Sequence, residues 1–406
     1  MATIAVIGTL DTKGTEHAYV ANLIRQQGHE TLLIDLGTGD EPTVKPDLTR
    51  EQVAAAANLD LAPLLARHDR GECVVAMSQA APVLLEKLAR EGRIHGVISL
   101  GGGGGTALAT AAMRALPLGF PKLMVSTLAS GNTAHYLGTK DIAMMPAIVD
   151  VAGLNRISRM VFTRAAAAIC AMVETPIDTT DSKPIIAASM FGNTTECIAH
   201  AKEVLEEAGY EVLVFHATGT GGKAMEDLIA SGMVSGVLDV TTTEWADELV
   251  GGTLSAGPTR LEAAAKAGIP AVIAPGCLDM VNFGSRESVP EIFANRNFYI
   301  HNPQVTLMRT TREECSELGK ILAEKANTYT APVTILLPEK AISIISAEGQ
   351  SFYDPSADQA LFDAIHRHSQ VPVISLKETI NSHAFAKAAA KQLLQNIAAT
   401  AQSPRT

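Results

Sequence analysis

Aromatic and charged residues are both scarce in this sequence. Phe, Trp and Tyr together make up 4% of its 406 residues and charged residues 18%, whereas hydrophobic residues reach 47%. A chain this apolar can bury a large core, which excludes an intrinsically disordered protein. Its length favours two domains over one.

Dense basic runs are missing too, and the formal net charge is -11. Proteins that bind nucleic acids usually carry a basic stripe, so we expect no nucleic-acid partner. A phosphorylated ligand remains compatible with an acidic protein, because backbone amides bind anions locally.

Paired cysteines and long apolar segments are also absent. The five cysteines are scattered without a CxxC pair, which argues against a zinc cluster or a disulfide scaffold and favours a reducing compartment. We find neither a signal peptide nor an apolar run of membrane-spanning length. We therefore expect a cytoplasmic protein without membrane contact.

Strand-like and helix-like segments alternate in the first half of the chain. An apolar run over 3–7 precedes a helical stretch over 15–27 and a second apolar run that ends at Asp35. Apolar runs at 96–100 and 121–127 then flank a glycine run and an alanine-rich helix. Such alternation predicts βαβ units around a parallel sheet.

The second half repeats this order. Its apolar runs match those of the first half in order and spacing: 184–190, 211–216, 236–240 and 269–275. We predict an α/β protein with two tandem Rossmann-like doubly wound domains related by internal duplication, 1–178 and 184–406. The polar, proline-containing stretch 174–184 is the predicted linker.

The loop from Gly8 to Glu16 follows the first strand. In an open parallel sheet, ligands bind beyond the carboxyl ends of the strands, where helix N-termini favour phosphate. The candidate ligand-binding residues here are Gly8, Thr9, Asp11, Thr12, Lys13 and Gly14. A simple capped turn explains the same residues equally well.

Five consecutive glycines follow the strand at 96–100. A turn needs only one or two glycines, and each one costs backbone entropy, so close approach of a ligand explains the excess better than a flexible linker. The candidate residues are Gly101, Gly102, Gly103, Gly104, Gly105 and Thr106.

A third polar loop runs from Ser126 to Asp141. Its candidates for phosphate or ribose contact are Ser130, Gly131, Asn132 and Thr133. Asp141 is a candidate Mg²⁺ ligand. Asp35 stands where dinucleotide-binding folds place the ribose-binding acid. Each of these residues also fits an ordinary loop or cap.

Standard nucleotide motifs are not matched. The Walker pattern fails because Ala224 follows Lys223, and GxGxxG fails because Thr106 replaces its last glycine. NAD binding is therefore weakened but stays open as an alternative.

The second half carries its own acid and base candidates on polar loops: His216, Asp239, Glu244, Asp279 and His301. If they converge in a cleft, they could transfer protons to and from a small substrate. Each has a plainer explanation as a cap or a hydrogen-bonded structural residue. HExxH and GxSxG are absent, so neither a zinc protease nor a serine hydrolase is expected.

Several long motifs together resemble one family. They include GTLDTKGTE, SLGGGGGT and GNTAHYLGTKD in the first half, and SMFGNTTE, DVTTTEWADELVGG and HNPQVTLMRTT in the second. The chain resembles the bacterial members of the uncharacterised family that contains the inhibitory domain of the tomato mosaic virus resistance protein. The resemblance covers essentially the whole chain. It implies two Rossmann-like domains, ATP binding in the first and a homodimer, but no known reaction.

Three hypotheses follow. The first is an ATP-binding protein, with Mg²⁺ assisting. The second is an enzyme that acts on a small metabolite between the domains, with Asp239, Glu244, Asp279 and His301 as catalytic groups. The third is a non-catalytic sensor or scaffold that responds to nucleotide. The polar loops of the second half favour the enzyme slightly.

Overall fold

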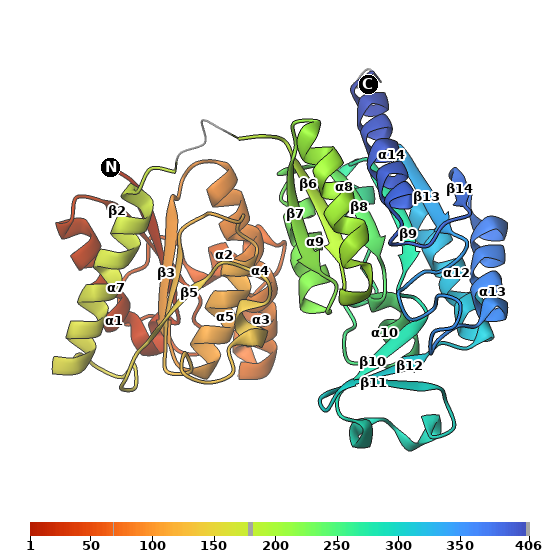
Figure 1. Cartoon of the computed structure of the whole chain (residues 1–406). Coiled ribbons are helices and arrows are strands. Elements are labelled where there is room, and N and C mark those ends of the chain that lie inside the picture. The colour runs from red at the N-terminus through yellow and green to blue at the C-terminus, as the bar shows by residue number, and fades with distance from the viewer. Residues whose placement is uncertain (68, 178–181, 403–406) are drawn as a thin grey trace. The chain divides into compact units, whose positions relative to one another are not determined.

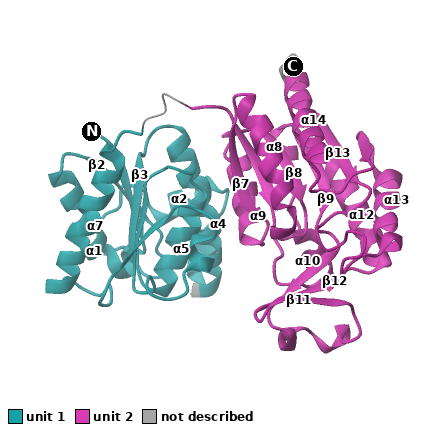
Figure 2. Ribbon diagram, in the orientation of Figure 1, with its two compact units in different colours: residues 1–179 teal, residues 180–406 magenta. Residues whose placement is uncertain are grey.

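The computed structural model describes residues 1–67, 69–177 and 182–402. The chain divides into two compact units, Met1–Thr179 and Thr180–Thr406 (Figure 2). Residues 178–181 of the predicted linker lie outside the described residues.

The first unit is a five-stranded parallel sheet with helices on both faces (Figure 1). Its elements are β1 (Thr3–Gly8), α1 (Leu10–Gln26), β2 (Glu30–Asp35), α2 (Arg50–Ala56), α3 (Ala62–Ala66), α4 (Arg70–Arg90), β3 (Gly96–Gly101), α5 (Gly103–Arg114), β4 (Lys122–Ser126), α6 (Ala134–Leu137), β5 (Ala143–Pro146) and α7 (Arg156–Glu174). The strand order is β2-β1-β3-β4-β5. The chain therefore leaves β1 toward one edge and β3 toward the other, which makes the β1/β3 border the switch point where such folds bind ligands.

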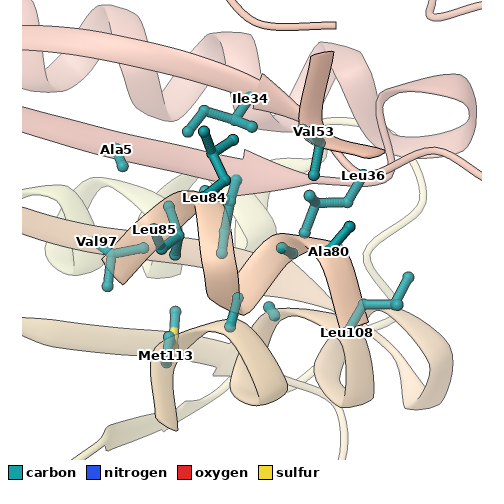
Figure 3. Packing of buried hydrophobic residues seen from close by; sticks show 14 of the residues in the cluster. Ala5, Ile34, Leu36, Val53, Ala80, Leu84, Leu85, Val97, Leu108 and Met113 are labelled. Carbon is teal, nitrogen blue, oxygen red and sulfur yellow. The ribbon is translucent and has the colours of Figure 1, made fainter. Parts of the chain in front are cut away.

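Alternate strand residues face opposite layers of this unit. Ala5 and Ile7 pack against α2, α4 and α5, whereas Ile4 and Val6 pack against α1 and α7. In the first cluster Leu84 of α4 lies close to the strand residues (Figure 3). Burial on both faces explains why these strands read as continuous apolar runs in the sequence.

The second unit contains a six-stranded parallel sheet and a small antiparallel one. Its elements are β6 (Ile185–Met190), η1 (Gly192–Thr194), α8 (Thr195–Glu207), β7 (Glu211–His216), α9 (Thr220–Ala230), β8 (Val234–Thr241), α10 (Glu244–Val250), α11 (Ala263–Ala267), β9 (Ala271–Gly276), β10 (Met280–Phe283), η2 (Arg286–Ser288), η3 (Glu291–Phe293), β11 (Phe298–Asn302), β12 (Val305–Arg309), α12 (Arg312–Ala326), β13 (Val333–Pro338), α13 (Pro355–His368), β14 (Val373–Leu376) and α14 (His383–Gln402). The parallel order is β14-β13-β9-β8-β6-β7, and the antiparallel order is β10-β12-β11.

The predicted fold class is confirmed: each unit is built on a parallel α/β sheet of Rossmann-like order. The first four strands of the two units share one order, with β7-β6-β8-β9 in the second matching β2-β1-β3-β4 in the first. Doubly wound sheets share this order widely, so the internal duplication stays a prediction.

All five cysteines are buried and unpaired. Burial raises the pKa of the Cys170 and Cys315 thiols to about 11 in each case. Among the described residues, no helix is both long and apolar enough to cross a membrane.

Candidate functional site

A cavity of about 310 Å³ opens at the β1/β3 border of the first unit. The residues that line it are Thr9, Asp11, Thr12, Lys13, Thr38, Gly39, Asp40, Val74, Gly102, Gly103, Gly104, Gly105 and Leu108. The structure thus brings together the first predicted loop and the glycine run, because both follow the carboxyl ends of adjacent strands.

The glycine run is not the loop that the sequence suggested. Gly101 is the last residue of β3 and Gly103 the first of α5, so only Gly102 lies between them. The N-cap of α5 is Gly102, and no side chain of the described residues caps this helix. The first turn of a helix has amides without intrahelical partners, and here these amides belong to glycines that line the cavity.

Only part of the glycine run is required by packing. A Cβ on Gly101 would lie 3.1 Å from the backbone of Gly105, a tight contact, so β3 or α5 would have to move by a few tenths of an ångström to accept a larger residue there. On Gly102 and Gly103 the nearest atoms would be 3.6 and 3.8 Å away, which is ordinary contact. None of these glycines has a positive φ. Gly102 is the N-cap of α5, a position where glycine is favoured, whereas neither packing among the described residues nor backbone conformation explains the glycine at 103.

Helix α1 begins at Leu10, earlier than predicted, so most of the first predicted loop is helical. The Asp11 carboxylate accepts from the amides of Thr12, at 2.8 Å, and Gly39, at 3.0 Å. The Lys13 ammonium donates to the carbonyl of Val151. Lys13 also interrupts the helix with φ -132° and ψ 23°.

Two predicted ligand residues of this loop are needed for packing instead. A Cβ on Gly8 would lie 2.0 Å from Nε2 of His17, and a Cβ on Gly14 would lie 2.4 Å from Oγ1 of Thr43. The His17 ring is buried, bonds to the Lys13 carbonyl at 2.7 Å and receives the Leu100 amide at 3.3 Å. Burial lowers the pKa of His17, so the ring is a neutral link between α1 and β3.

Asp35 holds the backbone next to the cavity in place without lining the cavity itself. Its Oδ1 accepts from the amides of Leu10, at 3.1 Å, and Gly37, at 2.8 Å, which fixes the start of α1 and the loop after β2. The side chain is buried, and burial raises its pKa. Asp35 does not line the cavity, so this geometry indicates a positioning role rather than the predicted ribose contact.

The third predicted loop borders the glycine run only at its start, where Thr127 and Leu128 lie nearest to Gly102 and Gly103. Its four candidates Ser130, Gly131, Asn132 and Thr133 are not among the lining residues. Thr106 is buried and shares a 2.7 Å hydrogen bond with Ser126, which fastens α5 to β4.

Asp141, the predicted Mg²⁺ ligand, is paired with Lys122. Its Oδ1 lies 2.7 Å from the Lys122 ammonium, and its Oδ2 accepts from the Gly119 amide at 2.8 Å. Burial alone would raise the pKa of Asp141, but these two partners lower it. The carboxylate thus neutralises a buried lysine away from the cavity. Among the described residues, no group of three or more His, Cys, Asp or Glu side chains is placed to hold a metal ion.

In the second unit, Asp239 and Glu244 surround one buried arginine. Arg260 lies 2.5 Å from Asp239, 2.7 Å from Glu244 and 3.1 Å from Glu226. Burial alone would lower the pKa of Arg260, but the three carboxylates raise it well above its usual value. Ser189 also donates to Asp239 at 2.7 Å.

The remaining candidates of the second unit lie elsewhere. Asp279 is fully buried, where its Oδ2 accepts from Ser343 at 2.8 Å and its Oδ1 has no partner among the described residues. Burial raises the pKa of Asp279. His216 and His301 both line a separate cavity, which contains none of the three acids. The four predicted catalytic residues therefore do not share one cleft within this unit.

Two family models together match almost the whole chain. The model of the uncharacterised protein family UPF0261, N-terminal domain, matches residues 2–178, and that of its C-terminal domain matches residues 183–397. The chain belongs to this family. The UPF0261 protein of Clostridium tetani is 48% identical over 395 residues, which cover 96% of this chain and 98% of that protein.

A plant relative extends the family beyond bacteria. The ToMV resistance protein Tm-1(GCR237) of Solanum lycopersicum is 37% identical over 414 residues, covering 96% of this chain and 55% of the tomato protein. The predicted resemblance is thus confirmed. Among solved structures, the MurG protein of Acinetobacter baumannii aligns over 97% of this chain and 100% of its own, with 11% identity and a TM-score of 0.22. A likeness this weak carries no functional argument.

Sequence reasoning missed one side of the first cavity. The loop after β2 contributes Thr38, Gly39 and Asp40, and Arg50 holds this loop by donating to the carbonyls of Gly39, at 2.8 Å, and Asp40, at 2.7 Å. The signal was present, because a Gly- and Asp-containing segment directly follows a predicted strand. By contrast, Val74 reaches the cavity from α4, and no local pattern marks it.

Proposed function

We propose that the first unit binds a nucleoside phosphate, ATP, at the β1/β3 border. The observation that carries the proposal is the run of glycines at the N-terminus of α5. Glycine is favoured at the N-cap, which is Gly102, but a glycine inside a helix costs roughly 0.5–1 kcal/mol relative to alanine, and the contacts of the described residues do not require one at Gly103. Close approach of an anion to the bare amides supplies the missing reason.

The chemistry of the lining fits such a ligand. The Gly103–Gly105 amides and the partial positive charge of the α5 N-terminus suit phosphate oxygens. Hydroxyls of Thr9, Thr12 and Thr38 can donate to the same oxygens. Val74 and Leu108 provide apolar surface for a flat base, which favours a nucleotide over free phosphate.

Two carboxylates in the lining argue for a divalent cation. Asp11 and Asp40 would repel a polyphosphate if nothing lay between them. Mg²⁺ is usually held by one or two carboxylates together with substrate phosphates, so a cluster of three protein ligands is not needed. We therefore replace Asp141 with Asp11 and Asp40 as the proposed Mg²⁺-binding residues. The cation would neutralise phosphate charge beside these carboxylates.

Gly103→Ala should weaken ATP binding while leaving the fold intact. The added methyl group meets only Leu128 Cδ1, at 3.8 Å, but stands where phosphate oxygens would approach the amides. We expect at least about a tenfold rise in Kd, whereas the unfolding free energy of the first unit rises by about 0.5–1 kcal/mol because glycine is removed from a helix. Isothermal titration with Mg·ATP and hydrogen exchange of α5 measure the two effects.

The matched control is Ala107→Ser on the exposed side of α5, which does not line the cavity. It should bind ATP as the wild type does. The proposal would be refuted if the wild-type protein did not bind ATP at millimolar concentration, or if Gly103→Ala bound ATP with unchanged affinity. Binding of NAD in preference to ATP would support the dinucleotide alternative instead.

Asp40→Asn should reduce the Mg²⁺ dependence of ATP binding. In the wild type we expect chelation of Mg²⁺ to weaken binding about tenfold, and in the variant only about threefold, because one carboxylate ligand is gone. Titrations with and without EDTA measure this ratio. Glu86→Gln changes an exposed acid of α4 outside the cavity and should behave like the wild type. An equal ratio in Asp40→Asn and the wild type would show that Asp40 does not contact the cation.

A further inference from the structure

The second unit contains a cavity of its own, of about 540 Å³. It is lined by Phe191, Gly192, Asn193, His216, Thr218, Leu254, Tyr299, His301, Asn302, Val305, Leu307, Ile344 and Ile345. Phe191 follows β6, and His216 ends β7, so the cavity lies at the carboxyl edge of the parallel sheet. Open α/β sheets bind their ligands at this edge.

A small antiparallel sheet covers that edge. Strands β10, β11 and β12 are inserted between β9 and α12, and they lie together beyond one end of the parallel strands (Figure 1). Side chains two residues apart on a strand share a face. Tyr299 and His301 accordingly line the cavity, whereas Ile300 between them does not.

The walls of the cavity are aromatic and aliphatic. The rings of Phe191 and His216 lie 5.4 Å apart, and those of Tyr299 and His301 lie 6.5 Å apart. Ile344, half exposed, adds an aliphatic wall from the segment after β13. A flat or branched apolar body would bury itself against these side chains.

Charge restricts the ligand further. Among the residues that the structure describes, no Asp, Glu, Lys or Arg lines this cavity. A cation would lose its hydration here without gaining a carboxylate, and a polyanion would find no fixed positive charge. Hydrogen-bonding capacity comes from two imidazoles, two amide side chains and two hydroxyls. These groups suit a single carboxylate or carbonyl oxygen.

We propose that this cavity is a small-molecule binding site for a compact aromatic or branched-chain monocarboxylate, or its neutral amide or ester. The apolar body lies between Phe191 and Tyr299, and the oxygen end faces His216 and His301. The lining residues named above all belong to the second unit, so the proposal does not rest on nucleotide binding by the first.

Three fluorinated probes with one shared ring test the proposal. They are 4-(trifluoromethyl)benzoate, its neutral benzamide and the cationic 4-(trifluoromethyl)benzylamine, each titrated into the full chain by ¹⁹F NMR without nucleotide. The ¹⁹F signals of the benzoate and the benzamide should broaden on binding at millimolar concentration or below, and the signal of the benzylamine should not. Absence of broadening by both the benzoate and the benzamide, or equal binding of all three, overturns the proposal.

Variants locate the binding. Gly192→Leu places a side chain where a Cβ meets nothing within 4 Å, so it should fill the cavity without disturbing the fold and raise the Kd of the benzoate at least about tenfold. His301→Ala should raise the Kd of the benzoate by about threefold to tenfold, because a hydrogen bond to the ligand is lost. Ile300→Ala, at a 52% exposed position outside the lining, is the control and should change nothing. Benzoate binding that is unchanged in Gly192→Leu would place the probe elsewhere and overturn the assignment.

Discussion

Replacing Arg260 with methionine is expected to destabilise the second unit by about 3–5 kcal/mol. The guanidinium is 1% exposed and is the shared partner of Asp239, Glu244 and Glu226. Without it, Asp239 and Glu244 stay out of contact with water, Glu226 is only slightly exposed, and the three carboxylates repel one another. Removing one member of a buried ionic network costs this much because the remaining charges are left uncompensated.

The carboxylates around Arg260 also hold nearby backbone amides in place. A methionine at position 260 could not keep these carboxylates in position. Glu244 accepts from the amides of Gly219, at 2.7 Å, and Gly222, at 3.0 Å, while Glu226 accepts from Leu261 at 2.8 Å. Leu261 has a φ of 75°, a strained value for a residue with a side chain. Loss of Arg260 should therefore loosen the segment around α11 as well as lower the unfolding free energy.

Urea unfolding followed by Trp245 fluorescence measures the effect. Trp245 is the single tryptophan of the chain and is buried in the second unit, so its signal reports that unit alone. Arg312→Met, an exposed arginine at the start of α12, is the control and should change the free energy by less than about 0.5 kcal/mol. Combining Arg260→Met with Asp239→Asn and Glu244→Gln should recover part of the loss, since the uncompensated charges are then gone. A single variant as stable as the wild type would disprove this account.

The parallel framework was predictable because burial on both faces leaves a local signature. Strands such as β1 and β6 are short apolar runs bounded by polar turns, and their pattern alone predicts a βαβ arrangement. The confirmed fold class depends on this local information.

The glycine run shows where local information misleads. Consecutive glycines normally indicate a loop, yet Gly103, Gly104 and Gly105 form the first turn of α5. The helix continues through Ala-rich sequence and packs Leu108 and Met113 into the core, so tertiary contacts outweigh the poor helix propensity of glycine. The glycines line the cavity, but as a helix terminus instead of the predicted loop.

Neither the antiparallel cover nor the buried arginine could be predicted from local sequence patterns. Strand β10 has only four residues, and its flanks read as polar loop. Arg260 stands in an ordinary polar stretch, and its partners are 16 to 34 residues away. Whether a carboxylate such as Asp239 faces solvent or a buried cation depends on long-range packing, which is why acids predicted to be catalytic lie in an ion cluster.

Asp247→Asn should stabilise the second unit at neutral pH and remove part of its pH dependence. Burial raises the pKa of Asp247 from 3.8 to about 7, although the side chain and amide of Asn282 oppose that rise. A raised folded-state pKa stabilises the fold fully below the unfolded value near 3.8, and this stabilisation is lost as pH rises through about 7. The asparagine cannot lose a proton, so it avoids the loss.

The geometry allows the neutral form to be satisfied. Oδ1 of Asp247 accepts from the Asn282 amide at 2.9 Å, and its Oδ2 accepts from Asn282 Nδ2 at 2.7 Å. Asn282 Oδ1 is buried without a partner among the described residues, so turning this amide over would present an acceptor to a protonated or amidated residue 247. A shift of about three pKa units corresponds to about 4 kcal/mol, the upper bound on the change in relative stability between pH 4 and 8.

Urea titrations of Trp245 fluorescence at a series of pH values between 4 and 8 give the comparison. The unfolding free energy of the variant minus that of the wild type should increase with pH, and most of the change should fall between about pH 4 and 7. Asp363→Asn changes an exposed acid on α13, and its unfolding free energy should depend on pH as that of the wild type does. A constant difference between Asp247→Asn and the wild type across this range would mean that the pKa of the buried carboxyl is not raised by folding, because hydrogen bonds to its charged form offset its burial.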